Sequence, residues 1–318
     1  MKTIATLFSL LILISFAKAD VPNFTSETDS TEILAFIDSM TAIYDSIENS
    51  IQYQRGEIPI IDGQGTLKIP EGFKYVGQEQ SHYIMSELYG NPADPTMIGI
   101  LMPEEMGITY GEGYIFVLYY DAMGYVKDDD AQEIDYEELL DQMREDATEE
   151  NKERISNGME TYKIIGWAEK PYYDSNKKVL HWAKEIKFES DTAVNTLNYN
   201  ILILGRKGVL TMNAISTMAE FQEVEAQKQN IINMFSFNEG YQYDDFDSKT
   251  DEVAAWTIGG LVAGQILAKV GFFAIILKYI KIIGIGIAAA GAAVWRWIAG
   301  RKKKKEEGPD SYRDQPEV

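Results

Sequence analysis

The densest group of side chains that could bind a metal ion is an acidic run within GYVKDDDAQEID, formed by Asp128, Asp129 and Asp130. Calcium is bound by carboxylate and carbonyl oxygens, and an EF-hand loop places oxygen ligands at positions 1, 3 and 5, glycine at 6 and glutamate at 12. Counted from Asp128, position 6 is Glu133 and position 12 is Leu139. The run is therefore not an EF-hand. The remaining metal hypothesis for this run is an irregular site for Ca2+ or another divalent cation. No other cofactor is predicted.

The same stretch also has the features of a helix start. Asp135 is a favourable N-cap, and Glu138 follows three residues later, as in a capping box. Ile134 and Leu139 flank this start at the spacing of a hydrophobic staple. On this alternative a helix begins at Asp135, and the three preceding aspartates form a solvated turn.

Other groups that could carry catalysis are sparse. The chain has no cysteine, which excludes a thiol nucleophile and disulfides, and its two histidines are His82 and His181. His181 and Glu185 have the spacing H-x-x-x-E, but in a strand they would lie about 13 Å apart, at about 3.3 Å per residue, and could not share a metal ion. No catalytic residue is therefore assigned. Acid–base catalysis by carboxylates, as in an envelope hydrolase, stays an alternative because residues 20–252 contain 45 of them.

The net charge of −21 is divided unevenly along the chain. Residues 20–252 hold 45 acidic and 17 basic residues, whereas residues 253–305 hold nine basic residues and no acidic one. Nucleic-acid binding is disfavoured, because phosphate contacts need a basic face. Arg206 and Lys207 form one basic spot in this acidic region. We expect them to lie in a β-turn, with contact to an acidic ligand as the alternative.

Both ends of the chain predict export and membrane anchoring. Residues 1–19 have a basic start, an apolar run and the end Ala-Lys-Ala, which is typical of a signal peptide cleaved between Ala19 and Asp20. Residues 253–300 are apolar and predict a membrane-associated segment with one transmembrane helix. The tail 301–318 begins with RKKKK, which favours the cytoplasmic side. We therefore expect a single-pass membrane protein with its N-terminal domain exported and its C-terminus in the cytoplasm.

Two lysines interrupt the apolar segment. A charge at the bilayer centre costs at least about 2.5–3.5 kcal/mol, so Lys278 and Lys281 are expected near a boundary or against a partner helix or anionic lipid. Glycine and alanine recur over residues 284–293, which is compatible with close helix packing and a homo-oligomer. The sequence leaves open whether residues 253–277 span the membrane or lie on it.

The region between the two ends predicts an α+β domain with a mainly antiparallel sheet and flanking helices. Residues 20–54 are expected to form an N-terminal amphipathic helix, because apolar residues repeat at alternating spacings of three and four. Within the domain, 55–240, alternating apolar residues and short links predict neighbouring antiparallel strands, as in VLHWAKEIKF and TLNYNILILG. Helices are predicted over 78–89, from Asp135, over 149–157 as a separate element, and over 217–234. Residues 241–252 are expected to be an acidic connector to the membrane.

Several stretches in a fixed order resemble one bacterial family. They are IPEGFKYVG, YGNP, GILMPE, GYVKDDDAQEIDYEELL, NKERISNG, GWAEKPYYD, LHWAKE, NTLNYNILILGRKGVLTMNAIS and GYQYDDF. The chain is similar over about residues 55–300 to domain-of-unknown-function family 2167, described as predicted membrane-anchored proteins. The resemblance implies a signal sequence, an exported α+β domain and a C-terminal anchor, and it implies no activity. We expect the anchor to lie in the inner membrane of a bacterial cell. We expect a binding or scaffolding role at the cell envelope with an unknown envelope protein as partner, and the hydrolase is the alternative.

Overall fold

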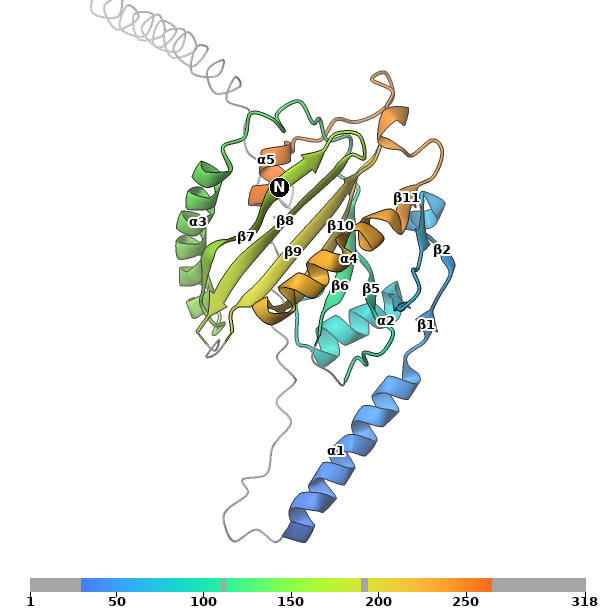
Figure 1. Cartoon of the computed structure of the whole chain (residues 1–318), viewed down its shortest axis with the longest axis vertical. Helices are drawn as coiled ribbons and strands as arrows, with labels where there is room; N and C mark the ends of the chain where they lie inside the picture. The colour runs from blue at the N-terminus through green and yellow to red at the C-terminus, as the bar shows by residue number, and fades with distance from the viewer. Residues whose placement is uncertain (1–29, 110–112, 190–193, 265–318) are drawn as a thin grey trace, which may run out of the picture. The chain divides into compact units, whose positions relative to one another are not determined.

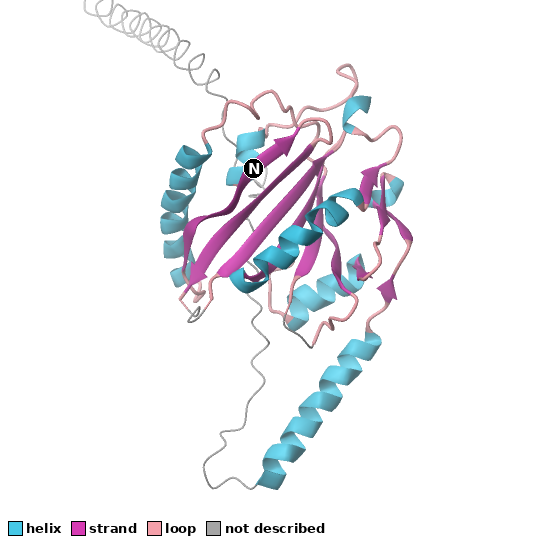
Figure 2. Cartoon of the chain, viewed as in Figure 1, coloured by secondary structure: helices cyan, strands magenta, loops and turns pink. Residues whose placement is uncertain are grey.

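The main feature of the computed structural model is an eight-stranded antiparallel sheet, within the described residues 30–109, 113–189 and 194–264 (Figures 1 and 2). Neighbouring strands follow the order β1-β4-β5-β6-β10-β9-β8-β7. In that order the strands are β1 (Tyr53–Gln54), β4 (Phe73–Gly77), β5 (Met97–Pro103), β6 (Ile115–Asp121), β10 (Val209–Thr217), β9 (Thr196–Leu204), β8 (Val179–Phe188) and β7 (Tyr162–Asp174). The long strands β8, β9 and β10 pair in continuous register and position the site below, whereas the edge strand β7 pairs with β8 through several register shifts.

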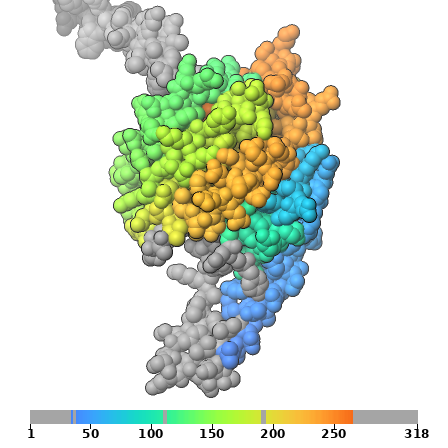
Figure 3. All heavy atoms as spheres, viewed as in Figure 1, coloured from blue at the N-terminus to red at the C-terminus, as the bar shows by residue number. Residues whose placement is uncertain are grey.

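One face of this sheet is covered by helix α4 (Phe221–Asn233) and a second, three-stranded sheet. That small sheet has the order β11-β3-β2, with β11 (Phe235–Phe237), β3 (Gly65–Lys68) and β2 (Glu57–Ile60), and a turn at η1 (Ile61–Gly63) joins β2 to β3. A 3-10 turn, η3 (Met218–Glu220), leads into α4. The apolar side of α4 packs on the strands, with Val224 and Ile231 fully buried against residues such as Tyr199. Figure 3 shows α4, in orange, covering part of this face.

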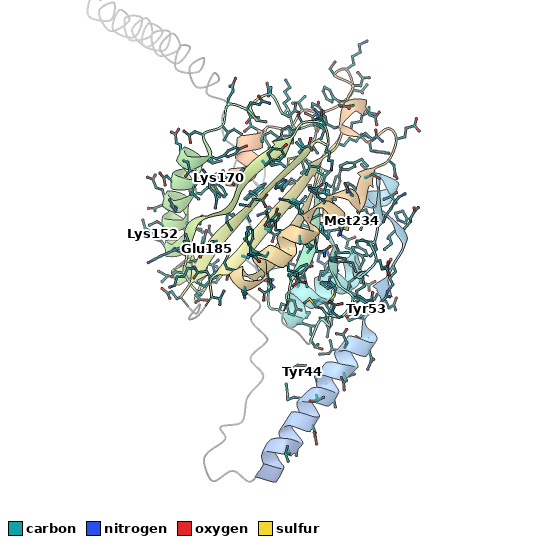
Figure 4. The ribbon with its side chains drawn as sticks, in the orientation of Figure 1. Tyr44, Tyr53, Lys152, Lys170, Glu185 and Met234 are labelled. Carbon is teal, nitrogen blue, oxygen red and sulfur yellow. The ribbon has the colours of Figure 1, made fainter. Side chains whose placement is uncertain are left out.

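The opposite face carries three helical segments. These are α2 (Gln78–His82), continued by the π-helical turn η2 (Tyr83–Leu88), then α3 (Tyr136–Ser156) and α5 (Ile258–Ala263). Helix α3 lies along the edge strand β7, where the Arg144 Nε donates to the Ile164 carbonyl at 3.2 Å. Lys170, labelled in Figure 4, pairs with Glu137 of α3 at 2.5 Å. Side chains of α3 thereby occupy an edge that would otherwise expose backbone groups.

Alternation along the central strands explains why both faces are buried. In β9, Leu197, Tyr199, Ile201 and Ile203 belong to the cluster under α4, whereas Leu202 and Leu204 belong to the cluster under α3 and α5. A strand with period two presents one set of side chains to each layer. The exceptions on the α5 side are Asn198 and Asn200, which are buried although they are polar.

Helix α1 (Ser30–Ser50) joins the domain through its C-terminal end. The Glu48 carboxylate accepts a hydrogen bond from the Ile108 N–H at 2.7 Å and one from the Tyr53 hydroxyl. Along the helix Met40, Tyr44 and Ile47 are half-buried, while Leu34 and Ile43 are exposed. These positions fit the predicted amphipathic helix of residues 20–54 where the structure describes it.

The predicted α+β class with an antiparallel sheet and flanking helices is confirmed. Two details differ. The separate helix expected over 149–157 is wrong, because α3 continues to Ser156 without a break. The expected connector 241–252 and the start of the apolar segment pack on the domain: Tyr243 of η4 (Tyr243–Asp245) is buried, and Ile258 is fully buried in α5. Apolar residues that the sequence assigns to the membrane instead complete the domain's own core.

Within the ranges that the structure describes, no helix is both long and apolar enough to cross a bilayer. The predicted signal peptide and its cleavage residues Ala19 and Asp20 lie outside the described residues. The same is true of the predicted span from 265 onward, with Lys278 and Lys281, and of the tail 301–318.

Candidate functional site

A cavity of about 80 Å³ lies on the sheet face that carries α5. Its floor is formed by side chains of β6, β10, β9 and β8, and one wall is formed by α5 and Trp256. The segment before β5 closes another side with Asp94 and Thr96. The floor and walls include Tyr119, Thr211, Asn213, Asn200, Leu202, Trp182, Lys184, Leu261, Val262 and Gly264. The lining combines aromatic and aliphatic walls with a few polar groups, as ligand pockets generally do.

The asparagines of the floor hold one another in place. Asn213 of β10 donates to Asn200 of β9 at 2.7 Å, and Asn200 donates to Asn198 at 2.9 Å. Asn198 in turn donates to Asn213 at 3.4 Å. Asn213 and Asn200 are direct cross-strand partners, so the backbone register sets this amide cycle. A polar floor whose members satisfy one another is rigid before any ligand arrives.

Two polar atoms in the cavity lining have no hydrogen-bond partner among the described residues. They are the Trp182 Nε1 and the Tyr119 hydroxyl, and both atoms are fully buried. Burial raises the pKa of Tyr119, so its hydroxyl remains protonated and able to donate. A buried polar group without a partner costs about 1–3 kcal/mol. Two such groups in one cavity are the pattern expected where a ligand supplies the missing partners.

Lys184 adds a buried cation to this lining. The residue is only 3% exposed. Burial lowers the pKa of Lys184 to about 8, and the negative charge of Glu150 on α3 opposes this shift only in part. Among the described residues none forms a hydrogen bond or ion pair with the Lys184 ammonium. Buried lysines without a paired acid are rare, because the charge loses its hydration.

The acid in the lining is already engaged. One oxygen of Asp94 accepts hydrogen bonds from the Thr96 N–H at 2.8 Å and the Thr96 hydroxyl at 2.7 Å. Lys184 stands on β8 and Asp94 precedes β5, so β6, β10 and β9 separate their strands. The cavity therefore has a cationic end at β8 and an acidic end at β5.

A second polar cluster lies on the other face of the sheet and is built around Glu169. Glu169 of β7 accepts a hydrogen bond from the Lys228 ammonium of α4 at 2.6 Å and another from the Tyr199 hydroxyl. The His181 Nδ1 lies 3.3 Å from the same carboxylate without hydrogen-bond alignment. Burial would raise the pKa of Glu169, but these three neighbours outweigh it and lower the pKa to about 2. The cluster ties α4 to the sheet.

The histidine prediction can be compared directly with this cluster. VLHWAKEIKF is strand β8, so the prediction that His181 and Glu185 cannot share a metal ion is consistent with the structure. Glu185, labelled in Figure 4, instead accepts from the Asn195 side chain at 2.5 Å. The acidic neighbour of His181 is Glu169, which comes from the adjacent strand.

The acidic run does not converge on one point. Asp128 accepts hydrogen bonds from the Tyr173 hydroxyl at 2.7 Å and the Lys178 ammonium at 2.9 Å. Asp130 accepts from the first two N–H groups of α5, those of Ile258 and Gly259, at 3.1 Å each. Asp129 is exposed. Over the described ranges no three His, Cys, Asp or Glu residues are grouped so that they could hold a metal ion.

The helix start after this run follows the sequence pattern. The Asp135 carboxylate accepts from the N–H groups of Glu137 and Glu138 at 3.0 and 3.2 Å, which confirms it as the N-cap of α3. Ile134 and Leu139 pack in the same apolar cluster, as the staple requires. This stretch therefore has two structural roles: Asp135 caps α3, and Asp130 accepts from the first two N–H groups of α5, whose own N-cap is Thr257.

The basic spot lies in the turn between β9 and β10, as predicted. The Gly205 N–H donates to the Gly208 carbonyl at 2.9 Å across this turn. Arg206 forms a two-pronged pair with Asp251 at 2.7 and 3.0 Å. The Lys207 ammonium lies 5.3 Å from the Tyr241 ring centre. Arg206 thus holds the segment 241–252 to the domain, and its contact with an acidic ligand remains a prediction.

Sequence reasoning did not identify the cavity residues, although a signal for them was present. Lys184 shares its side of β8 with Leu180, Trp182 and Ile186, which is an apolar face. Asn198 and Asn200 interrupt the buried side of β9 in the same way. A charge and two amides on neighbouring buried faces are the pattern that could have indicated a site, but the pairing of β8 with β9 was needed to bring them together.

Comparison with solved structures gives only distant similarity. The cyanobacterial PsbP of Synechocystis sp. PCC 6803 is 8% identical, with a TM-score of 0.34, over 59% of this chain and 93% of that one. The Ran-binding protein Mog1p of Saccharomyces cerevisiae is 12% identical, with a TM-score of 0.29, over 59% of this chain and 96% of that one. No argument rests on either. No curated protein matches the chain.

The family comparison is decisive over most of the chain. A family model described as "Protein of unknown function (DUF2167)" matches residues 52–291, which include every strand of the main sheet and all of the cavity residues. This range also agrees with the span over which the motif order suggested the resemblance. The chain therefore belongs to the DUF2167 family.

Proposed function

We propose that this protein is a membrane-anchored protein of the bacterial cell envelope whose exported domain binds a small ligand in the cavity above β8, β9, β10 and β6. The observation that carries the proposal is a pair of buried polar atoms left without partners among the described residues, the Trp182 Nε1 and the Tyr119 hydroxyl, in a lining that also holds the buried, unpaired Lys184. All three line one cavity, so one ligand could satisfy them together.

Binding is favoured over hydrolysis by the state of the carboxylates. A general acid or base works best with a pKa near the operating pH. The most perturbed carboxylate, Glu169, has its pKa lowered to about 2 and is held by Lys228 and Tyr199. In the cavity, Asp94 is engaged by Thr96. A scaffolding role with an envelope partner is compatible with ligand binding, and the ligand would then control that contact.

The cellular placement rests on the sequence of the two ends. The signal-like residues 1–19 and the RKKKK tail support an exported domain and a cytoplasmic C-terminus. A reporter that is active only outside the cytoplasm, fused after Val318, should remain inactive. An active reporter would refute this topology.

A ligand screen on the full-length chain in mild detergent tests the binding proposal. We expect at least one small polar metabolite to raise the thermal unfolding temperature. Replacing Thr211, which lies on the cavity floor, with Phe should abolish that shift. The matched control Ser236→Phe, at an exposed position on β11, should leave it unchanged. Equal shifts in both variants would place the binding elsewhere and refute the proposed cavity.

A further inference from the structure

We infer that the cavity selects a small monocarboxylate, whose carboxylate group lies against Lys184 and Trp182 at the β8 end. This inference rests on the proposed ligand-binding function and names the chemical class that the cavity takes. The carboxylate is either that of a free acid or the C-terminus of a peptide, since the chemistry at the β8 end is the same for both.

The groups without partners in the cavity are donors, two of them at the β8 end and one, the Tyr119 hydroxyl, on β6. The Lys184 ammonium has three N–H groups, the Trp182 Nε1 is a donor only, and the Tyr119 hydroxyl is protonated. The neighbouring amide of Asn200 already donates to Asn198 and accepts from Asn213. A ligand that satisfies these groups must therefore present acceptor atoms, and an anionic acceptor would also compensate the buried ammonium.

The charge and the size of the cavity limit the class of ligand further. Lys184 is the single cation of the lining, and Asp94 lies at the opposite end, so the cavity offers one positive charge to a ligand. A dianion would leave charge uncompensated in a largely apolar space, and the monoanion of inorganic phosphate would leave polar oxygens without partners there. A closed cavity of about 150 Å³ accommodates benzene. The 80 Å³ here accordingly suits about three or four heavy atoms, which is a carboxylate with a short stem. Any larger body would extend through the open side.

The pH dependence of binding follows from the groups that face Lys184. Those groups are Glu150 on α3 and, across the cavity, Asp94. An anion binds the protonated lysine, and burial lowers the pKa of Lys184 to about 8. Affinity should therefore be constant below that pH and fall above it, to about thirty-fold weaker at pH 9.5 than at pH 6.5.

The test compares matched probes on the full-length chain in mild detergent. Propionate, propionamide and propylamine are titrated by calorimetry at pH 6.5, together with inorganic phosphate and an N-acetyl dipeptide as its acid and its amide. We expect propionate to bind at least about ten-fold more tightly than propionamide, propylamine or phosphate. Preference for the dipeptide acid over propionate would identify the peptide terminus as the source.

Two substitutions assign the preference to Lys184. Lys184→Met should remove the preference for acid over amide, and Lys184→Arg should restore it by keeping the charge. Lys187→Met is the control, because Lys187 is exposed on the same strand. Amide binding as tight as acid binding, phosphate binding more tightly than propionate, or no acid binding at all would overturn the inference. If a neutral ligand still binds and Thr211→Phe blocks it, the binding function stands and only the ligand class fails.

Discussion

Replacing Lys184 with Met should make the protein more stable at neutral pH, although it removes a native side chain. Burial lowers the pKa of Lys184 from 10.5 to about 8. A lowered lysine pKa means that the folded state disfavours the charged form. Folding is therefore penalised at pH values below 8, where lysine is protonated in both states, and the penalty fades as pH rises toward 10.5. Met has a similar length and no charge to bury.

The size of the effect follows from the pKa difference. One pKa unit corresponds to about 1.4 kcal/mol, so the penalty at pH 7 is about 3 kcal/mol. At pH 9.5 the unfolded state holds most of its proton and the folded state little, and the penalty falls to about 1 kcal/mol. Lys184→Met should exceed the wild type in unfolding free energy by these amounts.

Urea unfolding of both proteins at pH 7 and pH 9.5, followed by tryptophan fluorescence, measures the difference. Lys187→Met, at an exposed position near the end of the same strand, should change the unfolding free energy by less than about 0.5 kcal/mol at either pH. Equal stabilities, a lower stability of the Lys184 variant at pH 7, or a difference that does not change with pH would refute the reasoning. A native residue that destabilises its own fold is typical of a functional site.

Three further predictions concern the groups outside the cavity. Asp130→Ala should lower the unfolding free energy by about 1–2 kcal/mol, because the N–H groups of Ile258 and Gly259 lose their acceptor although Thr257 still caps α5; Glu133→Ala in the same turn should have little effect in the same urea titration. Glu169→Gln should cost about 2–3 kcal/mol at pH 7, where the ionised carboxylate holds Lys228. Since the pKa of Glu169 is lowered from 4.5 to about 2, the wild type should lose this advantage as pH falls through that range, and a parallel pH dependence of the two proteins would contradict the assignment. EDTA should leave the thermal unfolding temperature unchanged, because Asp128 and Asp130 already bind protein donors; a fall that Ca2+ reverses would restore the metal hypothesis.

Local patterns in the sequence predict much of this fold. Alternation in β8 and β9 gives both strands and the faces of their side chains, and the Asp135 cap is read from three residues. Local patterns do not predict which residues far apart in the sequence contact one another. Glu169 reaches Lys228 across 59 positions, and Asp130 reaches Ile258 across 128, so neither contact leaves a local trace. The sequence of residues 253–264 is ambiguous in the same way, since its apolar residues fit either a membrane or a protein core.

The position of α5 has a consequence for how ligand binding in the cavity could be coupled to the chain that follows Gly264. Leu261, Val262 and Gly264 form a wall of the cavity, and Gly264 is the last described residue before the apolar segment. Its left-handed backbone, with φ of 74°, ends the helix at that wall. By thermodynamic linkage, any force on the chain beyond Gly264 that changes the affinity of the cavity must be matched by an equal effect of cavity occupancy on that chain. A wall that ends at Gly264 is therefore the structural element through which such a coupling would act.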